Sequence, residues 1–300
     1  MRDLAHRPLA PASQRDRREL PLPFLSMREE ISPDGDSGER AAGPALSPVP
    51  PAFSAPAPRW WGHHFQEVRW QAELARLLID PVYRGVGIPR GTGASVMLIP
   101  GFLAGDASLV LMGDWLRRIG YAPVTSGIQS NVGCSDRALD RLEARLDRVF
   151  DASARPVALV GHSRGAHFAK AMAHRCPQKV AAVVSLGAGL DAPFDISVPT
   201  QWTLAAFRTL YAHTSDRVAR NGCLTDTCRC RFTRDYAGDF PARVPLTSIY
   251  SKEDGVVRWP ACVVPYAHCV EVSGSHVGLA FNRKVYRVLA ETLAQQTEVS

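Results

Sequence analysis

Val157-Ala-Leu-Val-Gly161-His-Ser163-Arg-Gly165-Ala166 is the stretch of this sequence that decides the fold. Its first four residues are apolar, which is typical of a strand buried on both faces. The Gly-x-Ser-x-Gly pentapeptide follows that strand directly and opens a helical segment, so it predicts a tight strand-to-helix turn that presents the Ser163 hydroxyl. Gly161 and Gly165 leave room for this turn, and the helix N-terminus faces the place where negative charge would develop.

Short apolar runs and amphipathic segments alternate on both sides of this motif. Strands are expected at residues 96–99, 121–128, 157–160, 180–186, 244–250 and 270–272. Helices are expected at residues 65–79, 109–120, from Ser135 as the capping residue to about Val149, at 166–175 and at 283–294. Repeated strand–helix units predict an α/β fold whose mostly parallel sheet is covered on both faces.

Composition divides the chain into a tail and a folded domain. Residues 1–58 hold 11 of the 23 prolines and no cysteine, which predicts a disordered, proline-rich tail. Residues 59–300 are expected to form the domain, in which Trp60 and Trp61 pack as anchors, with contact to a membrane as the alternative. Residues 191–243 interrupt the alternation and predict a helical cap insertion.

A serine hydroxyl becomes a useful nucleophile only when a base takes its proton, and a carboxylate usually orients that base. His276 lies in a glycine- and serine-rich loop after the last strand and is the preferred base, with His268 as the alternative. Asp254 follows the preceding strand and stands before a glycine, which favours it as the acid. Glu253 also qualifies by its chemistry.

Two backbone amides are needed to stabilise the oxyanion of such a reaction. The amide of Arg164, directly after the serine, is the first candidate. The second is expected in the loop after the strand at 96–99, at the amide of Phe102, with Leu103 as the alternative donor. The Arg164 side chain is expected to make a surface ion pair.

Four motifs together resemble bacterial esterases and lipases of the α/β-hydrolase superfamily over about residues 60–300. They are Ile-Pro-Gly-Phe-Leu-Ala-Gly-Asp from Ile99, Gly-His-Ser-Arg-Gly from Gly161, Tyr-Ser-Lys-Glu-Asp-Gly-Val-Val from Tyr250, and Gly-Ser-His from Gly274. The resemblance implies a triad of Ser163, Asp254 and His276, and hydrolysis through an acyl-enzyme without a cofactor. The chain departs from the usual pattern at Pro100, where many relatives carry histidine.

The substrate expected on this basis is a small-molecule carboxylic ester, with a lipid acyl chain as one option. Leu103, Trp202 and Phe207 are candidates for binding it, although aromatic residues of the insertion could equally bury the cap on the core. A thioesterase or an acyltransferase would use the same motifs with a different acceptor. From other classes, a non-catalytic ligand-binding protein on this scaffold and a partner-binding role of the tail stay open.

Charge and cysteine usage set the remaining expectations. The net charge of +6 is spread along the chain, so no nucleic-acid partner is expected. The longest apolar stretch, residues 180–190, is too short for a membrane span, and no secretory signal is visible, so a cytoplasmic protein is expected. Cys223, Cys228 and Cys230 lack the usual zinc spacing, so no metal is expected, while disulfides and export stay open.

Overall fold

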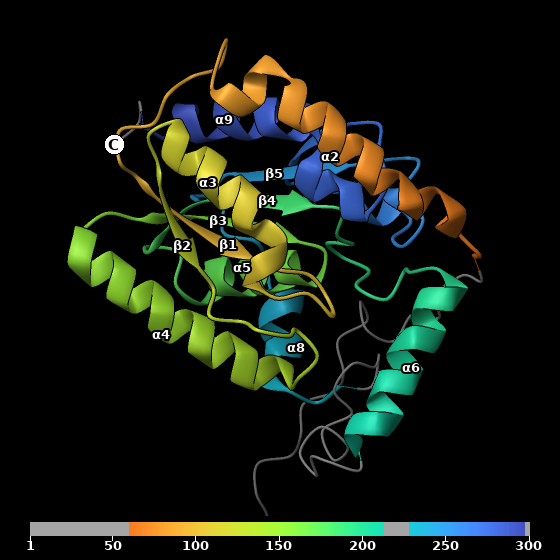
Figure 1. Cartoon of the computed structure of the whole chain (residues 1–300). Coiled ribbons are helices and arrows are strands. Elements are labelled where there is room, and N and C mark those ends of the chain that lie inside the picture. The colour runs from red at the N-terminus through yellow and green to blue at the C-terminus, as the bar shows by residue number, and fades with distance from the viewer. Residues whose placement is uncertain (1–59, 213–227, 298–300) are drawn as a thin grey trace, which may run out of the picture. The chain divides into compact units, whose positions relative to one another are not determined.

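A parallel β-sheet forms the centre of the fold (Figure 1). The computed structural model describes residues 60–212 and 228–297. Its strands are β1 (Ser95–Ile99), β2 (Ala122–Thr125), β3 (Val157–His162), β4 (Val180–Leu186), β5 (Leu246–Tyr250) and β6 (His268–Glu271). They lie in the order β2-β1-β3-β4-β5-β6, and each neighbouring pair is parallel. All the strands predicted from the sequence are present.

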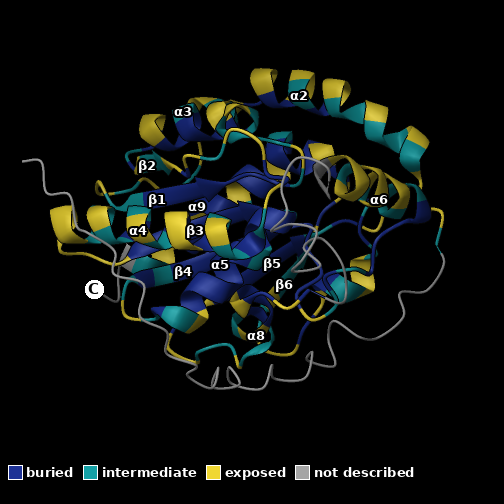
Figure 2. Cartoon of the chain, turned by 90° about the horizontal axis from the view of Figure 1, so that it is seen from below, coloured by how far each residue is buried: buried dark blue, intermediate teal, exposed yellow. Residues whose placement is uncertain are grey.

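Helices cover both faces of the sheet, which confirms the predicted α/β class (Figures 1 and 2). One layer contains α2 (Trp70–Ile79), α3 (Val110–Arg118) and α9 (Arg283–Thr297). The other contains α4 (Ser135–Ser153), α5 (Arg164–Arg175) and α8 (Arg231–Ala237). Successive strand residues point to opposite faces. Accordingly Leu159 packs with the α4, α5 and α8 side, whereas Val160 packs with the α2, α3 and α9 side.

The order of the strands determines where a site can form. From β1 the chain moves to β2 at one edge, and from β3 it moves through β4 and β5 to β6 at the other. The direction therefore reverses between β1 and β3, and ligands bind outside the carboxyl ends of parallel strands at such a point. The loop after β1 and the turn after β3 meet there.

The N-terminal helix differs from the expected continuous helix. It begins as a 3₁₀ turn, η1 (His64–Arg69), and continues as α2. Leu77 is buried as expected, but Phe65 and Val68 are 96% and 67% exposed. The carboxylate side chain of Glu73 occupies the buried face instead, because it hydrogen-bonds a loop of the domain.

Two smaller expectations are corrected. Ser135 does not cap α4, since Cys134 occupies the N-cap position and Ser135 is the first helical residue. Trp61 is not a packed anchor, because its side chain is 62% exposed.

The predicted insertion contributes two described helices, α6 (Val198–Ala212) and α8. α8 packs against α5 and belongs to the layer that covers the sheet. The predicted tail at residues 1–58 and the middle of the insertion, residues 213–227, lie outside the described residues. Of the helices in the described part of the chain, none is both long enough and apolar enough to cross a bilayer.

Candidate active site

Ser163 stands in a strained turn between β3 and α5. Its φ and ψ angles are 52° and −124°, a region that non-glycine residues rarely adopt. The two glycines of the pentapeptide make the turn sterically possible. A Cβ atom on Gly161 would lie 2.4 Å from Ala166 N, and one on Gly165 would lie 2.1 Å from the Ile99 carbonyl oxygen. The chain therefore turns sharply at Ser163, between the end of β3 and the start of α5.

Asp254 and His276 lie in the loops that follow β5 and β6, and a hydrogen bond joins their side chains. His276 Nδ1 lies 2.6 Å from Asp254 Oδ2, and both residues are almost fully buried. The other carboxylate oxygen, Oδ1, accepts hydrogen bonds from the amides of Val256 and Val257, each at 2.8 Å. The carboxylate is therefore fixed in one orientation, with one oxygen left for the histidine.

The alternative acid and base lie elsewhere. The Glu253 side chain turns away and forms an ion pair with Arg69 at 2.6 Å. His268 is exposed at the start of β6. The structure thus brings together the preferred pair, Asp254 and His276, and neither of the two alternatives.

Opposing effects act on the pKa of His276. Burial lowers it, because the charged imidazolium loses water. The negative charge of Asp254, the hydrogen bond to Asp254 and the more distant charge of Glu67 act in the opposite direction and raise the pKa above its ordinary value. An imidazolium at this position is therefore stabilised by its surroundings.

The loop after β1 lies directly against Ser163. A Cβ atom on Gly101 would be 3.1 Å from the Ser163 Cβ, so a side chain at this position would crowd Ser163. Leu103 has a positive φ of 64°, which turns the loop sharply. Asn131 Nδ2 donates a 2.8 Å hydrogen bond to the Pro100 carbonyl and fixes the loop. No backbone carbonyl among the described residues accepts a hydrogen bond from the Phe102 amide.

The Arg164 side chain does not make the expected surface ion pair. It is 9% exposed and donates hydrogen bonds to the carbonyls of Asn131 and Gly133, each at 2.8 Å. A further bond of 3.1 Å reaches Ser135 Oγ. Because Asn131 also holds Pro100, the Arg164 side chain links helix α5 to the loop after β1.

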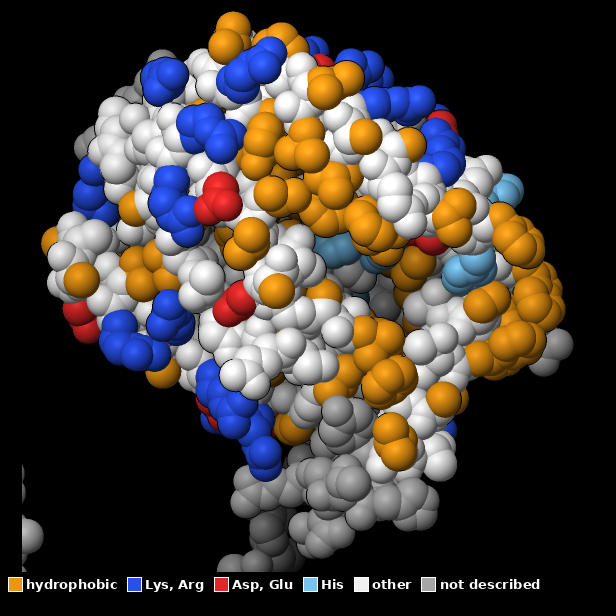
Figure 3. Space-filling model, in the orientation of Figure 1, with side chains coloured by type: hydrophobic (Ala, Val, Ile, Leu, Met, Phe, Trp, Pro, Cys, Tyr) orange, Lys and Arg blue, Asp and Glu red, His pale blue; other side chains and the backbone are white. Residues whose placement is uncertain are grey.

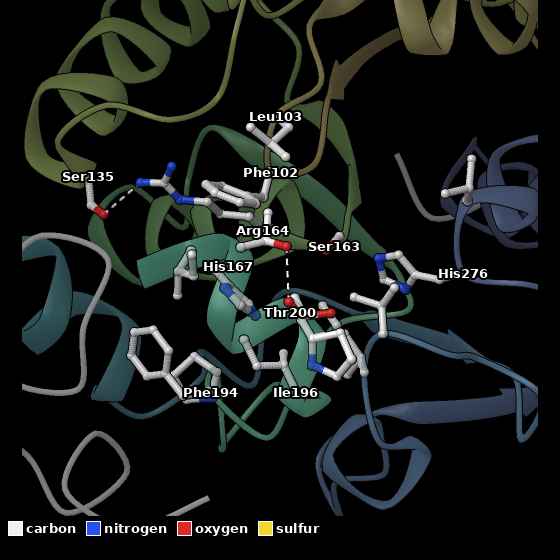
Figure 4. A pocket seen from close by; sticks show the side chains of 18 of the residues that line it. Phe102, Leu103, Ser135, Ser163, Arg164, His167, Phe194, Ile196, Thr200 and His276 are labelled. Carbon is white, nitrogen blue, oxygen red and sulfur yellow. Dashed lines mark hydrogen bonds between the residues drawn. The ribbon is translucent and has the colours of Figure 1, made fainter. Parts of the chain in front are cut away.

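A cavity of about 330 Å³ opens beside these groups. Hydrophobic side chains surround a hollow on the face drawn in Figure 3, and histidine side chains are visible inside it. In Figure 4 the His276 ring projects toward Ser163. The lining includes Ser163, His276, Phe102, Leu103, Thr200 and Leu204.

Two of the predicted substrate-binding residues lie apart from this lining. Trp202 is 61% exposed and packs edge to face against Trp61, with ring centroids 5.4 Å apart. Phe207 packs edge to face against Phe102, which lines the cavity, with ring centroids 5.8 Å apart. Leu103 alone of the three lines the cavity.

Solved structures of known proteins are similar in fold to this chain. No family model and no curated protein matches the sequence. Among solved structures, a soluble variant of monoglyceride lipase from Saccharomyces cerevisiae in complex with a substrate analogue aligns with a TM-score of 0.53, 14% identity, and coverage of 70% of this chain and 90% of that one. The chain has the α/β-hydrolase fold.

Other solved structures match at lower TM-scores. Monoacylglycerol lipase from Paleococcus ferrophilus matches with a TM-score of 0.49 and 14% identity, over 69% of this chain and 97% of that one. A lipase from Bacillus licheniformis matches with a TM-score of 0.48 and 15% identity, over 69% of this chain and 95% of that one.

Within the α/β-hydrolase fold, a carboxylate that sequence reasoning missed holds the two loops together. Glu67 Oε1 accepts hydrogen bonds from the amides of Gly255 and His276, each at 2.9 Å. Its Oε2 accepts from the Val277 amide at 3.0 Å. Glu67 therefore joins the loop that carries Asp254 to the loop that carries His276.

Two further missed residues fix the same histidine loop. Glu73 accepts hydrogen bonds from the amide and the hydroxyl of Ser275, at 2.9 and 2.8 Å. His162 Nε2 lies 2.9 Å from the His276 carbonyl. Burial, with the neighbouring charge of His276, lowers the pKa of His162 to about 4, so its neutral ring donates this bond from Nε2.

The cysteines give no metal site within the described residues, where no group of three or more His, Cys, Asp or Glu side chains could hold an ion. Cys223, the first member of the predicted cluster, lies outside them. Cys230 instead approaches Cys134, with the sulfurs 3.7 Å apart.

Proposed function

We propose that this chain is a serine hydrolase that cleaves carboxylic esters. The observation that carries the proposal is the buried hydrogen bond between Asp254 and His276, beside the same cavity as a serine held at a strained strand-to-helix turn. A buried Asp–His pair facing a serine is the arrangement that activates a hydroxyl for acyl transfer. Lipases among the structural neighbours are consistent with an ester as substrate.

The proposed reaction begins when Ser163 attacks the ester carbonyl carbon and His276 takes the hydroxyl proton. The amides of Phe102 and Arg164 stabilise the oxyanion, and His276 then gives its proton to the leaving alcohol. Water, activated by the same histidine, releases the acid from the acyl-enzyme. Asp254 orients the imidazole and stabilises its charged form without taking the proton.

A fluorophosphonate probe tests this proposal directly, because it labels only an activated serine. We expect the purified full chain to be labelled at Ser163, and His276→Ala to lose the labelling. His268→Ala, which changes an exposed histidine, serves as the matched control and should be labelled like the wild type. A folded wild-type protein that takes up no probe would contradict the proposal.

The pH profile offers a second prediction, which concerns Glu67. The base must be neutral, so kcat/KM should rise with pH through the pKa of His276, above the ordinary value of about 6.5. Glu67→Gln removes one negative charge that raises this pKa. In this variant the rise of kcat/KM with pH should therefore occur at a lower pH than in the wild type. The plateau of kcat/KM should also fall on the order of tenfold. The new NH₂ group would face one of the three backbone amides that now donate hydrogen bonds to the Glu67 carboxylate.

Glu291→Gln, at an exposed position of α9, is the control and should leave both features unchanged. A Glu67→Gln variant with a lower plateau but an unmoved acid limb would show that Glu67 acts on loop structure without acting on the His276 charge.

A further inference from the structure

The loop after β1 carries the second proposed oxyanion donor, the backbone amide of Phe102. Phe102 lines the cavity beside Ser163 (Figure 4), and within the described residues its amide donates to no backbone carbonyl. A backbone donor stabilises an oxyanion only when it is held at the place where the negative charge develops. The contacts that hold this loop therefore decide whether the Phe102 amide can take part in the reaction.

Residues 100–104 form a turn that is strained in isolation. One hydrogen bond closes the turn, from the Ala104 amide to the Gly101 carbonyl, and at 3.2 Å it lies at the long end of the usual range. Leu103 within the turn has a φ of 64°, a conformation that a residue with a side chain keeps only where its surroundings impose it. The turn therefore depends on support from neighbouring segments.

Asn131, in the loop after β2, supports the turn at both of its ends. Its side-chain Nδ2 donates a hydrogen bond to the Pro100 carbonyl at 2.8 Å, and its backbone amide donates to the Ala104 carbonyl at 2.9 Å. The residue is 2% exposed, so water has little access to replace these bonds. Since Phe102 lies between Pro100 and Ala104, Asn131 holds the chain on either side of the proposed donor.

The Arg164 side chain fixes Asn131 in turn. Its Nη1 donates to the Asn131 carbonyl and its Nη2 to the Gly133 carbonyl, each at 2.8 Å. Arg164 directly follows Ser163, and its own backbone amide is the other proposed oxyanion donor. A continuous series of hydrogen bonds therefore connects the residues of the two donors, from the Arg164 guanidinium through Asn131 to the turn that contains Phe102.

We propose that Asn131 is a positioning residue of the oxyanion hole, which holds the Phe102 amide where the oxyanion forms. This role rests on the proposed ester hydrolysis. Asn131 is not among the described residues that line the cavity, so it acts on the substrate only through the turn. It should therefore affect the transition state, in which the carbonyl oxygen carries negative charge, far more than the binding of an uncharged ester.

Asn131→Leu tests this role, because it removes the Nδ2 donor while the side chain stays branched at the same carbon. The backbone bond to the Ala104 carbonyl stays possible. We expect kcat for hydrolysis of a chromogenic ester to fall about tenfold to a hundredfold, as when one oxyanion donor is weakened or lost. KM should stay within about threefold of the wild type.

Two ketone inhibitors separate positioning from general damage to the cavity. With a trifluoromethyl alkyl ketone, the Ser163 oxygen bonds to the carbonyl carbon, the hydroxyl proton passes to His276, and the carbonyl oxygen becomes an oxyanion. The methyl ketone with the same alkyl chain binds without this adduct. We expect Asn131→Leu to weaken inhibition by the trifluoromethyl ketone by about the same factor as kcat, and inhibition by the methyl ketone by less than about threefold.

Gln129→Leu, which changes an exposed amide side chain of the same loop, is the matched control and should keep wild-type kcat and inhibition. Thermal unfolding checks that each variant is folded. If Asn131→Leu does not fold, Asn131→Ser replaces it, since the serine side chain ends one bond short of the Nδ2 position.

A folded Asn131 variant with unchanged kcat would overturn the positioning role, as would one in which both ketones are weakened alike. If neither variant folds, Asn131 serves the stability of the fold and the positioning role is likewise overturned. None of these outcomes touches the proposed function. A wild type that neither hydrolyses the ester nor reacts with the fluorophosphonate would overturn both.

Discussion

Replacing Ser163 by alanine is expected to lower kcat for ester hydrolysis roughly a millionfold, to the residual rate that the oxyanion donors and substrate binding provide. Without the hydroxyl there is no acyl-enzyme, and His276 has no proton to move. His276→Ala should cost about as much, because an unactivated hydroxyl is a poor nucleophile. The double variant should then be scarcely slower than either single one, since the two side chains act as a unit.

Steady-state hydrolysis of a chromogenic ester by the three variants measures this non-additivity. Ser153→Ala, which alters an exposed serine at the end of α4, is the control and should keep wild-type activity. Losses that multiply in the double variant would mean that Ser163 and His276 act independently, and the proposed mechanism would be wrong.

Features set by local sequence were predictable. The apolar run before Gly161 and the two glycines around Ser163 determine the strand and the turn within ten residues, and both have the predicted form. Parallel strands bring their carboxyl ends to one edge of the sheet, so the loops that carry Asp254 and His276 could be placed near Ser163 without knowing any contact.

Contacts between distant segments were not predictable from periodicity. Glu67 and His276 are 209 positions apart, and nothing near either residue indicates the other. The role of Glu73 was not predicted for a related reason. An amphipathic pattern is recognised from its apolar residues, and here a carboxylate occupies the buried face of the helix. A buried acidic residue within an otherwise apolar helix face was the available signal.

Side-chain direction was the second limit. The insertion at residues 191–243 was expected to be helical, but the sequence alone could not tell whether Trp202 faces the cavity or solvent. Arginine is seldom buried, so a surface ion pair was the natural expectation for Arg164. The carbonyls of Asn131 and Gly133 satisfy its guanidinium instead, and they come from a loop whose conformation the sequence did not determine.

The pairing of Asp254 with its surroundings leads to a prediction about an isosteric change. In Asp254→Asn, the amide oxygen must keep the position of Oδ1, because the amides of Val256 and Val257 both donate to it and an NH₂ group cannot accept. The NH₂ group is then directed at His276 Nδ1. Two donors cannot share a hydrogen bond, so the imidazole must present a lone pair at Nδ1 and carry its proton on Nε2.

That tautomer cannot take the proton of Ser163, so we expect Asp254→Asn to lower kcat by about ten-thousandfold while the fold and the cavity persist. Ester hydrolysis gives the rate, and thermal unfolding checks that the protein is folded. Glu253→Gln, next to it in sequence but paired with Arg69 on the surface, should stay within a few fold of the wild type. If the two variants lost activity equally, the orientation of His276 would depend on the charge of the loop rather than on the hydrogen bond that His276 donates to Asp254. A large loss confined to Asp254→Asn would instead mean that the two backbone amides, by fixing one carboxylate oxygen, set the tautomer of the base.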